Sequence, residues 1–249
     1  MITSGVQILD MRSQVSASLI EDIYRHLLKP SFESNELDSF DTILDGLSEG
    51  GSYEAWGLCA LDGETPVGCV LGYPFTGSRA LLIGYVTVKP GLRSHGIGGL
   101  LMDHVEQKWY GKDDLALVVA EVEDPRHHRA AEGIDPKRRA AFYGRRGARV
   151  VVGPYFQPRV DSGSERVQNL FLTVLSGNSD AITPENSVRA AMLVDFLIEY
   201  FQQSGEGSDW PRADDEQGNQ LLAWYRGREL VHLHPISDYA QIQIPRLSG

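Results

Sequence analysis

The sequence predicts a mixed α/β fold in which helices flank one mostly antiparallel sheet. The apolar residues have a helical period over residues 16–50 and form strand-like runs after residue 52. The near-continuous apolar run "ALLIGYVTV" is typical of a central strand that is buried on both faces. Three glycines at positions 96, 98 and 99 separate this run from an amphipathic segment, which indicates a strand, a turn and a helix in succession.

The N-terminal part predicts two helices and then three strands. Apolar residues spaced by three or four positions indicate a helix within residues 16–28. A second helix is expected to begin at Ser34 or Asn35 and to end at the glycine pair 50–51. The segments "YEAWGLCALDG" and "TPVGCVLGYPF" predict a hairpin around an Asp-Gly turn, and "RALLIGYVTVKP" predicts the third strand.

The next part alternates helices and strands. A helix is expected from about residue 97 to 109 and a buried strand from 115 to 123. Asp135 and Pro136 supply a cap and a first-turn proline for the helix "KRRAAFYGRRG". The segments "ARVVVGP" and "VQNLFLTVL" predict a final antiparallel pair, which brings the first domain to about residue 176.

Residues 177–249 differ in pattern and are predicted to form a C-terminal helical extension. A long helix is expected to begin at Thr183-Pro184-Glu185 and to carry an apolar stripe from Val188 to Phe201. An acidic loop rich in glycine and serine follows, and a short apolar segment ends the chain. The stripe is typical of a packed helix or of a homodimer contact.

The composition is that of an ordinary globular protein, with 249 residues, 42% hydrophobic and 23% charged. A net charge of -11 argues against a large non-specific nucleic-acid surface, which requires positive charge. Cys59 and Cys69 are too few for a disulfide framework and are expected to be buried thiols. We see no secretory signal and no run of about 20 apolar residues, so the expected location is cytoplasmic, without a membrane span.

The turn between the central strand and the next helix has the chemistry of an anion site. Backbone N–H groups at a helix N-terminus favour a phosphate, and glycines allow the phosphate to approach the backbone. Arg93 adds a fixed positive charge to the turn. The stretch lacks the Gly-Lys-Ser/Thr ending of a P-loop, and it lacks a dinucleotide-type G-x-G-x-x-G.

The run Arg93-Ser94-His95-Gly96-Ile97-Gly98 has the pattern R-x-x-G-x-G, with "VTVKP" before it and "AFYGRRGA" after it. It resembles the acyl-CoA-binding motif of the GNAT superfamily of N-acetyltransferases. The resemblance covers residues 50–176 well and the two N-terminal helices loosely. It implies a GNAT-like acyltransferase domain over residues 1–176, with a splayed pair of central strands.

The resemblance also implies how acetyl-CoA, or another acyl-CoA, is bound as the donor. The backbone of the central strand would hold the pantetheine arm and the turn would hold the pyrophosphate. Tyr143 in "FYGRRG" matches the position where a tyrosine often protonates the departing thiolate. The alternative is an aromatic that packs on its helix with its hydroxyl at the surface. The cofactor-binding residues are then Val86, Thr87, Val88, Arg93, Ser94, His95, Gly96, Ile97, Gly98 and Gly99.

The central strand departs from the family pattern because it carries no carboxylate to deprotonate the amine. Its one titratable side chain is Tyr85. Glu121 and Glu123 on the next strand share one face and are the candidate bases, with the start of a solvated loop as the alternative. His127 and His128 match no metal site of defined geometry, so no metal is expected.

The acceptor site is predicted from two further segments. The resemblance implies that the loop "GPYFQPRV" borders the acceptor site, so Tyr155, Phe156 and Arg159 form with Tyr85 the predicted acceptor-binding set. A rigid cover of the hairpin is the alternative for this loop. Residues 126–149 hold eight Arg and Lys against two acids, which indicates either a solvated face or an anion-facing patch. Such a patch suits the CoA 3′-phosphate, a carboxylate-bearing acceptor or the end of a tRNA.

Three functions remain open from the sequence. The first is transfer of an acyl group, in the first place acetyl, from acyl-CoA to a small-molecule amine by direct attack in a ternary complex. The second is transfer of an aminoacyl group from aminoacyl-tRNA to a small molecule, as in natural-product biosynthesis. The third is a non-catalytic CoA-binding protein with a regulatory or interaction role.

Overall fold

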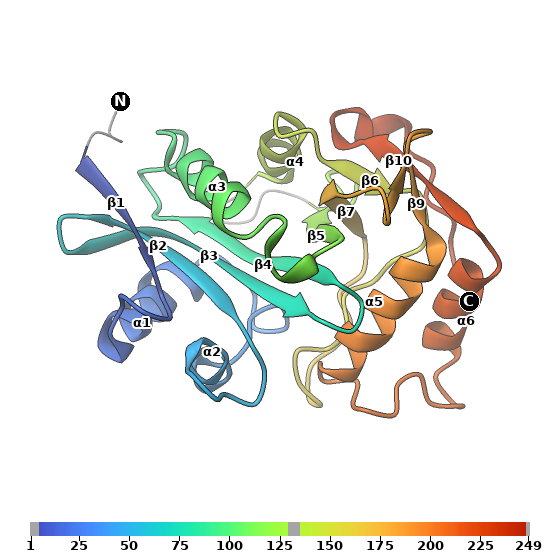
Figure 1. Cartoon of the computed structure of the whole chain (residues 1–249), viewed down its shortest axis with the longest axis horizontal. Helices are drawn as coiled ribbons and strands as arrows, with labels where there is room; N and C mark the ends of the chain where they lie inside the picture. Colours follow the sequence, from blue (N-terminus) through green and yellow to red (C-terminus); the bar gives the residue numbers. More distant parts are fainter. Residues whose placement is uncertain (1–4, 129–134, 248–249) are drawn as a thin grey trace. The chain divides into compact units, whose positions relative to one another are not determined.

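The computed structural model describes residues 5–128 and 135–247, and it confirms the mixed α/β fold with mostly antiparallel strands and flanking helices (Figure 1). The chain forms two compact units. The first unit comprises Met1–Pro74 and Leu82–Asp113, and the second comprises Phe75–Leu81 and Asp114–Gly249. The two central strands that were predicted to splay apart lie mainly in different units, so the splay stays a prediction.

The strands of the first unit follow one another in the order of the chain. They are β1 (Val6–Asp10), β2 (Trp56–Asp62), β3 (Thr65–Phe75) and β4 (Ala80–Val88). The last residue of β3 and the first two residues of β4 belong to the second unit. β2 pairs antiparallel with both β1 and β3, so the predicted hairpin is confirmed. Cys59 and Cys69 are register partners in it and are buried free thiols, as predicted. The short strand β1 was not predicted, because five residues are too few to show a period.

Helices cover both faces of these strands (Figure 1). α1 (Ala17–Ile23) continues into the π-helical turn η2 (Tyr24–Leu28), and α2 (Phe40–Leu47) lies on the same side. Cys59 and Leu61 of β2 join the apolar core beneath α1 and α2. α3 (Ile97–Lys108) covers the other face, where a Cβ on Gly68 would lie 3.1 Å from Ile97 and Leu101 side-chain atoms.

The predicted start of the second helix is wrong. α2 begins at Phe40, because the Ser39 hydroxyl accepts a hydrogen bond from the N–H of Thr42 and caps the helix there. Residues 34–39 stay outside the helix. This leaves a non-helical segment, residues 29–39, between η2 and α2.

The second unit is an antiparallel set of strands in the order β5-β7-β6-β10-β9-β8. The predicted pairing of β6 with β7 and the Asp135 cap of α4 are confirmed. The 3-10 turn η3 (Lys112–Asp114) precedes β5, and the 3-10 segment η4 (Ile236–Gln241) follows β10. The other elements are β5 (Leu117–Glu123), α4 (Pro136–Gly144), β6 (Arg149–Val151), β7 (Leu170–Gly177), β8 (Ile182–Thr183), β9 (Ser187–Arg189), α5 (Ala190–Gln202), α6 (Glu216–Arg226) and β10 (Leu230–Pro235).

The C-terminal residues contain strands as well as helices. The long helix was predicted to begin near residue 183, but α5 begins at Ala190, because β8 and β9 form a small hairpin before it. Val188, the first residue of the predicted stripe, instead pairs with Val231 of β10. Later stripe residues such as Phe196 and Phe201 are fully buried on α5. The domain boundary at residue 176 stays a prediction.

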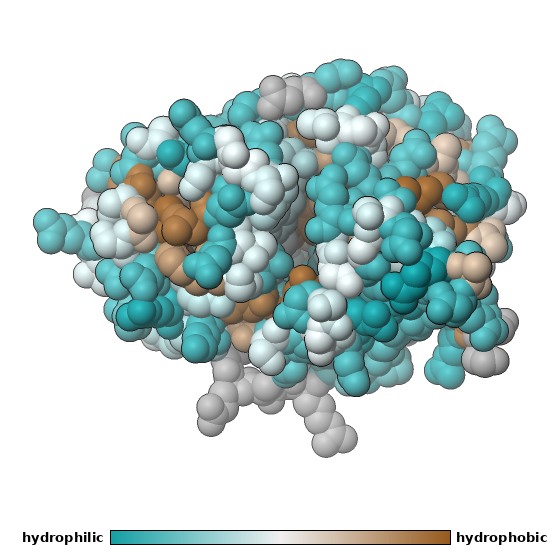
Figure 2. Space-filling model, turned by 90° about the horizontal axis from the view of Figure 1, so that it is seen from below, coloured by the Kyte–Doolittle hydropathy of each residue, from teal (hydrophilic) through white to brown (hydrophobic). Residues whose placement is uncertain are grey.

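The surface is mainly hydrophilic. Figure 2 shows one face on which apolar residues form only scattered patches. Among the described residues, Leu230 is the one large hydrophobic side chain that is exposed. Every helix in the described part of the chain is too short or too polar to cross a lipid bilayer.

Candidate active site

The turn after β4 presents backbone to solvent at the start of α3. Gly91 and Gly96 have φ values of 87° and 93°, which glycine adopts without strain. Ser94 has a φ of 66° and is exposed, as are His95 and Gly96. Gly96 occupies the N-cap position and has no side chain to cap the helix. The first N–H groups of α3 therefore remain available to an anion.

The space around this turn fits a ligand that approaches the backbone. A Cβ on Gly99 would meet no atom within 4 Å, so packing within the protein does not require this glycine. Gly98 and Gly99 are half-buried in the first turn of α3. Arg93 folds back on the strand, where its Nε donates to the Val88 carbonyl at 3.2 Å. His95 Nδ1 lies 2.9 Å from the Arg93 carbonyl oxygen.

The predicted pantetheine-binding residues lie at the end of β4. Val86 and Val88 are half-buried and alternate with the buried Thr87. The Thr87 hydroxyl lies 2.7 Å from the Ser31 hydroxyl, so its side chain is bonded within the first unit. Pantetheine binding at these three residues would therefore use their backbone, as the resemblance implies.

Tyr85 of β4 contacts the carboxylate of Asp38, although β4 itself carries no carboxylate. Its hydroxyl lies 3.1 Å from Oδ2 of Asp38, and the Tyr73 hydroxyl of β3 donates to the same oxygen at 3.1 Å. Burial raises the pKa of the Asp38 carboxyl, although both tyrosine hydrogen bonds act in the opposite direction. The sequence did not reveal Asp38, because its importance depends on tyrosines 35 and 47 positions away.

In the second unit, Glu121 of β5 is held by two tyrosines. Its carboxylate accepts a hydrogen bond from Tyr155, and the Tyr200 hydroxyl of α5 lies 3.3 Å from Oε2. Burial, with the nearby negative charge of Glu121, raises the pKa of Tyr155 far above its ordinary value. Tyr155 therefore stays protonated and donates to Glu121, as a hydrogen-bonding partner of a base would.

Glu123 and Glu121 have different partners. The Glu123 carboxylate lies 3.2 Å from Nη1 of Arg139 on α4. Glu121 therefore contacts tyrosine hydroxyls and Glu123 contacts a guanidinium, and the choice between them as a base stays a prediction.

Tyr143 lies on α4 and is buried. Burial raises its pKa, and the charges of Arg139 and Arg146 reduce this effect. The phenol consequently keeps its proton at neutral pH, which a general acid requires. The side chain is only 5% exposed, as expected of an aromatic that packs on its helix, so its role as an acid stays a prediction.

The remaining predicted acceptor residues are engaged within the second unit. Phe156 is fully buried, with its ring centroid 5.4 Å from that of Phe201. Arg159 Nη1 lies 4.0 Å from Glu206. Phe156 thus supports the core of the unit, whereas the partly exposed Arg159 retains contact with solvent.

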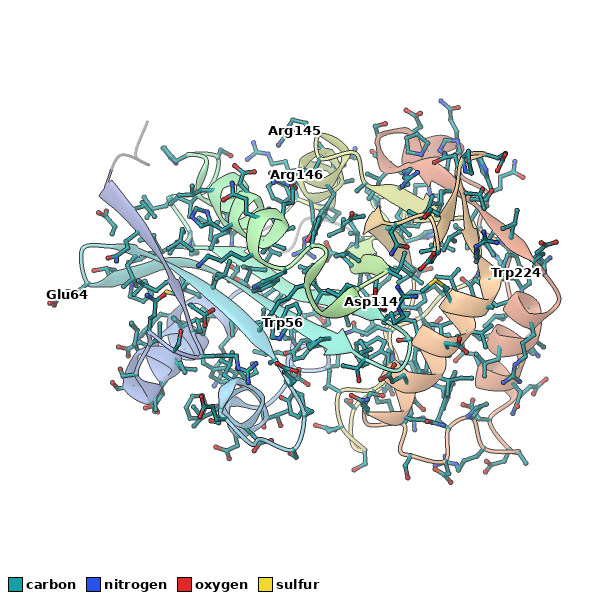
Figure 3. All side chains as sticks on the ribbon, viewed as in Figure 1. Trp56, Glu64, Asp114, Arg145, Arg146 and Trp224 are labelled. Atoms are coloured by element: carbon teal, nitrogen blue, oxygen red, sulfur yellow. The ribbon has the colours of Figure 1, made fainter. Side chains whose placement is uncertain are left out.

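The basic segment 126–149 is partly neutralised by its neighbours. Arg126 donates to both carboxylate oxygens of Asp124, and Arg149 donates to Asn186. Arg145 and Arg146 lie together at the C-terminal end of α4 (Figure 3). Two charged members of this segment, Arg129 and Glu132, lie outside the described residues.

The predicted histidines are likewise engaged in structural contacts. His127 lies 4.0 Å from Asp124, and His128 Nε2 lies 3.1 Å from the Asn169 carbonyl oxygen. Residues 5–128 and 135–247 contain no group of three His, Cys, Asp or Glu side chains placed to hold a metal ion.

Comparison with known proteins identifies the family. The sequence model of the Acetyltransferase (GNAT) family matches residues 20–146, which is half of the chain. The chain belongs to the GNAT acetyltransferase family. The match includes the turn at residues 93–99 and Tyr143, and the predicted family membership is thereby confirmed.

Several solved structures of GNAT proteins are similar to this chain. One is a protein named as a GNAT-family acetyltransferase from Bacteroides thetaiotaomicron, at 20% identity and a TM-score of 0.49, covering 70% of this chain and 89% of that one. Another is a GNAT-family acetyltransferase from Elizabethkingia anophelis with acetyl-CoA bound, at 16% identity and a TM-score of 0.47, covering 70% and 99%. No curated protein sequence matches the chain.

Proposed function

We propose that this GNAT protein transfers an acetyl group from acetyl-CoA to an amine of a small molecule by direct attack in a ternary complex. The observation that carries the proposal is the turn at residues 91–99, where exposed backbone leads into an uncapped helix N-terminus. Those N–H groups would hold the pyrophosphate, and Arg93 would add positive charge.

The other roles follow from the chemistry of the reaction. The amine nitrogen forms a bond to the thioester carbonyl carbon, the carbon–sulfur bond breaks, and its electrons leave with the sulfur. Backbone groups of Val86–Val88 would hold the pantetheine arm. Tyr143 would donate its proton to the departing thiolate. Glu121, which accepts a hydrogen bond from Tyr155, would be the residue of the second unit that accepts a proton.

Acetyl-CoA binding to a Gly99→Trp variant tests the donor site. The new ring would start in open space, so the fold is expected to persist while the ring blocks the turn. We expect calorimetry to show a loss of binding of about 100-fold or more, because the phosphates could no longer reach the N–H groups. Gly5→Trp, also at an open position, is the matched control. Unchanged binding by Gly99→Trp would refute the site.

Turnover separates the three functions that the sequence leaves open. Acetylation of members of an amine panel supports the proposal. Acetyl-CoA binding with no turnover over the whole panel would instead support a regulatory CoA-binding protein. Deacylation of charged tRNA without use of acetyl-CoA would support the aminoacyl donor.

A further inference from the structure

Asp38 in the first unit is a half-buried carboxylate without a cationic partner. It lies in the non-helical segment between η2 and α2. The tyrosine hydroxyls from β3 and β4 both lie 3.1 Å from its Oδ2. Over residues 5–128 and 135–247, no protein donor hydrogen-bonds to Oδ1, and no Lys, Arg or His forms an ion pair with Asp38.

The tyrosines around Asp38 are fixed by further contacts. The Tyr24 hydroxyl donates to the Asp38 carbonyl at 3.2 Å, and the Asp38 N–H donates to the Tyr85 hydroxyl at 3.0 Å. The ring centroids of Tyr73 and Tyr85 lie 6.2 Å apart, in an edge-on arrangement. The Tyr73 ring also occupies space above Gly84, where a Cβ would lie 2.7 Å from it. A glycine on β4 is thus required for this arrangement.

The negative charge of the half-buried Asp38 carboxylate would be stabilised by a nearby cation. Half-buried carboxylates are normally stabilised by an ion pair, because hydrogen bonds alone do not replace the lost hydration. Burial accordingly raises the pKa of Asp38, which makes the carboxylate a stronger base. Tyrosine rings attract cations, and the Tyr73 hydroxyl, which donates to Asp38, has lone pairs that can accept from an ammonium group.

We propose that Asp38 binds the ammonium group of the acceptor through Oδ1 and accepts its first proton, with Tyr73 and Tyr85 as positioning residues. The acceptor is then an alkyl amine that is protonated at neutral pH. Its nitrogen loses one proton to Asp38 and attacks the thioester carbonyl as a neutral amine. As the carbon–nitrogen bond forms, the second nitrogen proton passes to solvent water. The carbon–sulfur bond breaks, the thiolate takes a proton from Tyr143 and leaves as a thiol, and Tyr143 regains its proton from solvent. The proton-transfer part of this inference rests on the proposed acetyl transfer.

Thermal melting with small amines tests the binding part. The probes are butylamine and 1,4-diaminobutane, with 1-butanol as the neutral match. We expect the amines, and not the alcohol, to raise the melting temperature of the wild type. Asp38→Asn keeps the shape and an oxygen for the tyrosines but removes the charge, so its melting temperature should not respond. Asp41→Asn, an exposed site in the first turn of α2, is the matched control and should respond like the wild type.

Steady-state kinetics test the proton transfer. In Asp38→Asn we expect kcat/KM for butylamine to fall by about 30-fold or more, the usual effect of removing one member of a desolvated charge pair. Acetyl-CoA affinity should be the same in all three proteins. Tyr73→Phe should shift the acid limb of the pH profile of kcat/KM, which a purely structural role would not do.

The outcomes separate this inference from the proposed function. Wild-type melting that responds equally to amine and alcohol, or a value of kcat/KM in Asp38→Asn within threefold of wild type, would overturn the role of Asp38. Amine binding that depends on Asp38 without any turnover would overturn acetyl transfer, and with it the proton-transfer step, while supporting the ammonium site.

Discussion

Arg166 is expected to be a main source of stability in the second unit. Its guanidinium forms a bidentate pair with Glu206, at 2.7 Å for each contact, and a second bidentate pair with Asp215. The three side chains are 11%, 3% and 11% exposed. Arg166→Met would keep the aliphatic packing and leave two desolvated carboxylates without their cation.

Removal of one partner from a buried ion pair costs about 3–5 kcal/mol. Arg159 still lies 4.0 Å from Glu206, and the Gly218 N–H still donates to Asp215. These remaining contacts place the expected loss at the lower end, about 3 kcal/mol. The loss should depend little on salt, because the pairs are shielded from solvent.

Urea denaturation of wild type and Arg166→Met, followed by fluorescence and circular dichroism, measures this loss as a change in the free energy of unfolding. Arg212→Met is the matched control, because Arg212 pairs with Asp214 at 3.5 Å on the surface and both side chains are more than half exposed. It should cost less than about 1 kcal/mol. A loss below about 1 kcal/mol in Arg166→Met would refute the reasoning.

Two further predictions concern catalysis and pH. Tyr143→Phe should lower kcat by about 100-fold or more with little change in acetyl-CoA affinity, and an unchanged kcat would remove Tyr143 from the mechanism. Burial raises the pKa values of Glu206 and Asp215, but Arg166 and the other hydrogen-bonding partners together lower them by more, so both lie below their ordinary values. Their contribution to stability is therefore present above about pH 4 and is lost as the pH falls through the folded-state pKa values. Acid titration of the free energy of unfolding should show this loss in wild type and a much smaller one in Arg166→Met; equal acid dependence in both would contradict the assignment.

Much of the fold could be predicted because the decisive signals are local. The turn chemistry of Asp62-Gly63, the cap at Asp135 and the glycines after β4 each depend on a few neighbouring residues. The start of α5 could not be predicted in this way. Val188 fits an apolar helix stripe as well as a strand, and its pairing with Val231, 43 positions later, decides between them.

The candidate site also has a part that depends on neighbouring residues and a part that depends on distant ones. The donor side is a contiguous motif, so residues 93–99 could be identified from the sequence alone. The acceptor side depends on tertiary contacts. Glu121 gains its environment from Tyr155 and Tyr200, and Asp38 gains its environment from two strands that follow it in the chain. A lone aspartate before a helix has no local feature that distinguishes it from a solvated residue.

The place of β10 has a consequence for biosynthesis of the protein. Residues 230–235 lie between β6 and β9, so this interior strand leaves the ribosome after both of the strands with which it pairs. Until it arrives, β6 has an edge whose N–H and C=O groups can pair with another chain. The second unit can therefore be completed only after residue 235 has left the ribosome, and a nascent chain stalled before residue 230 is where aggregation or chaperone capture should concentrate.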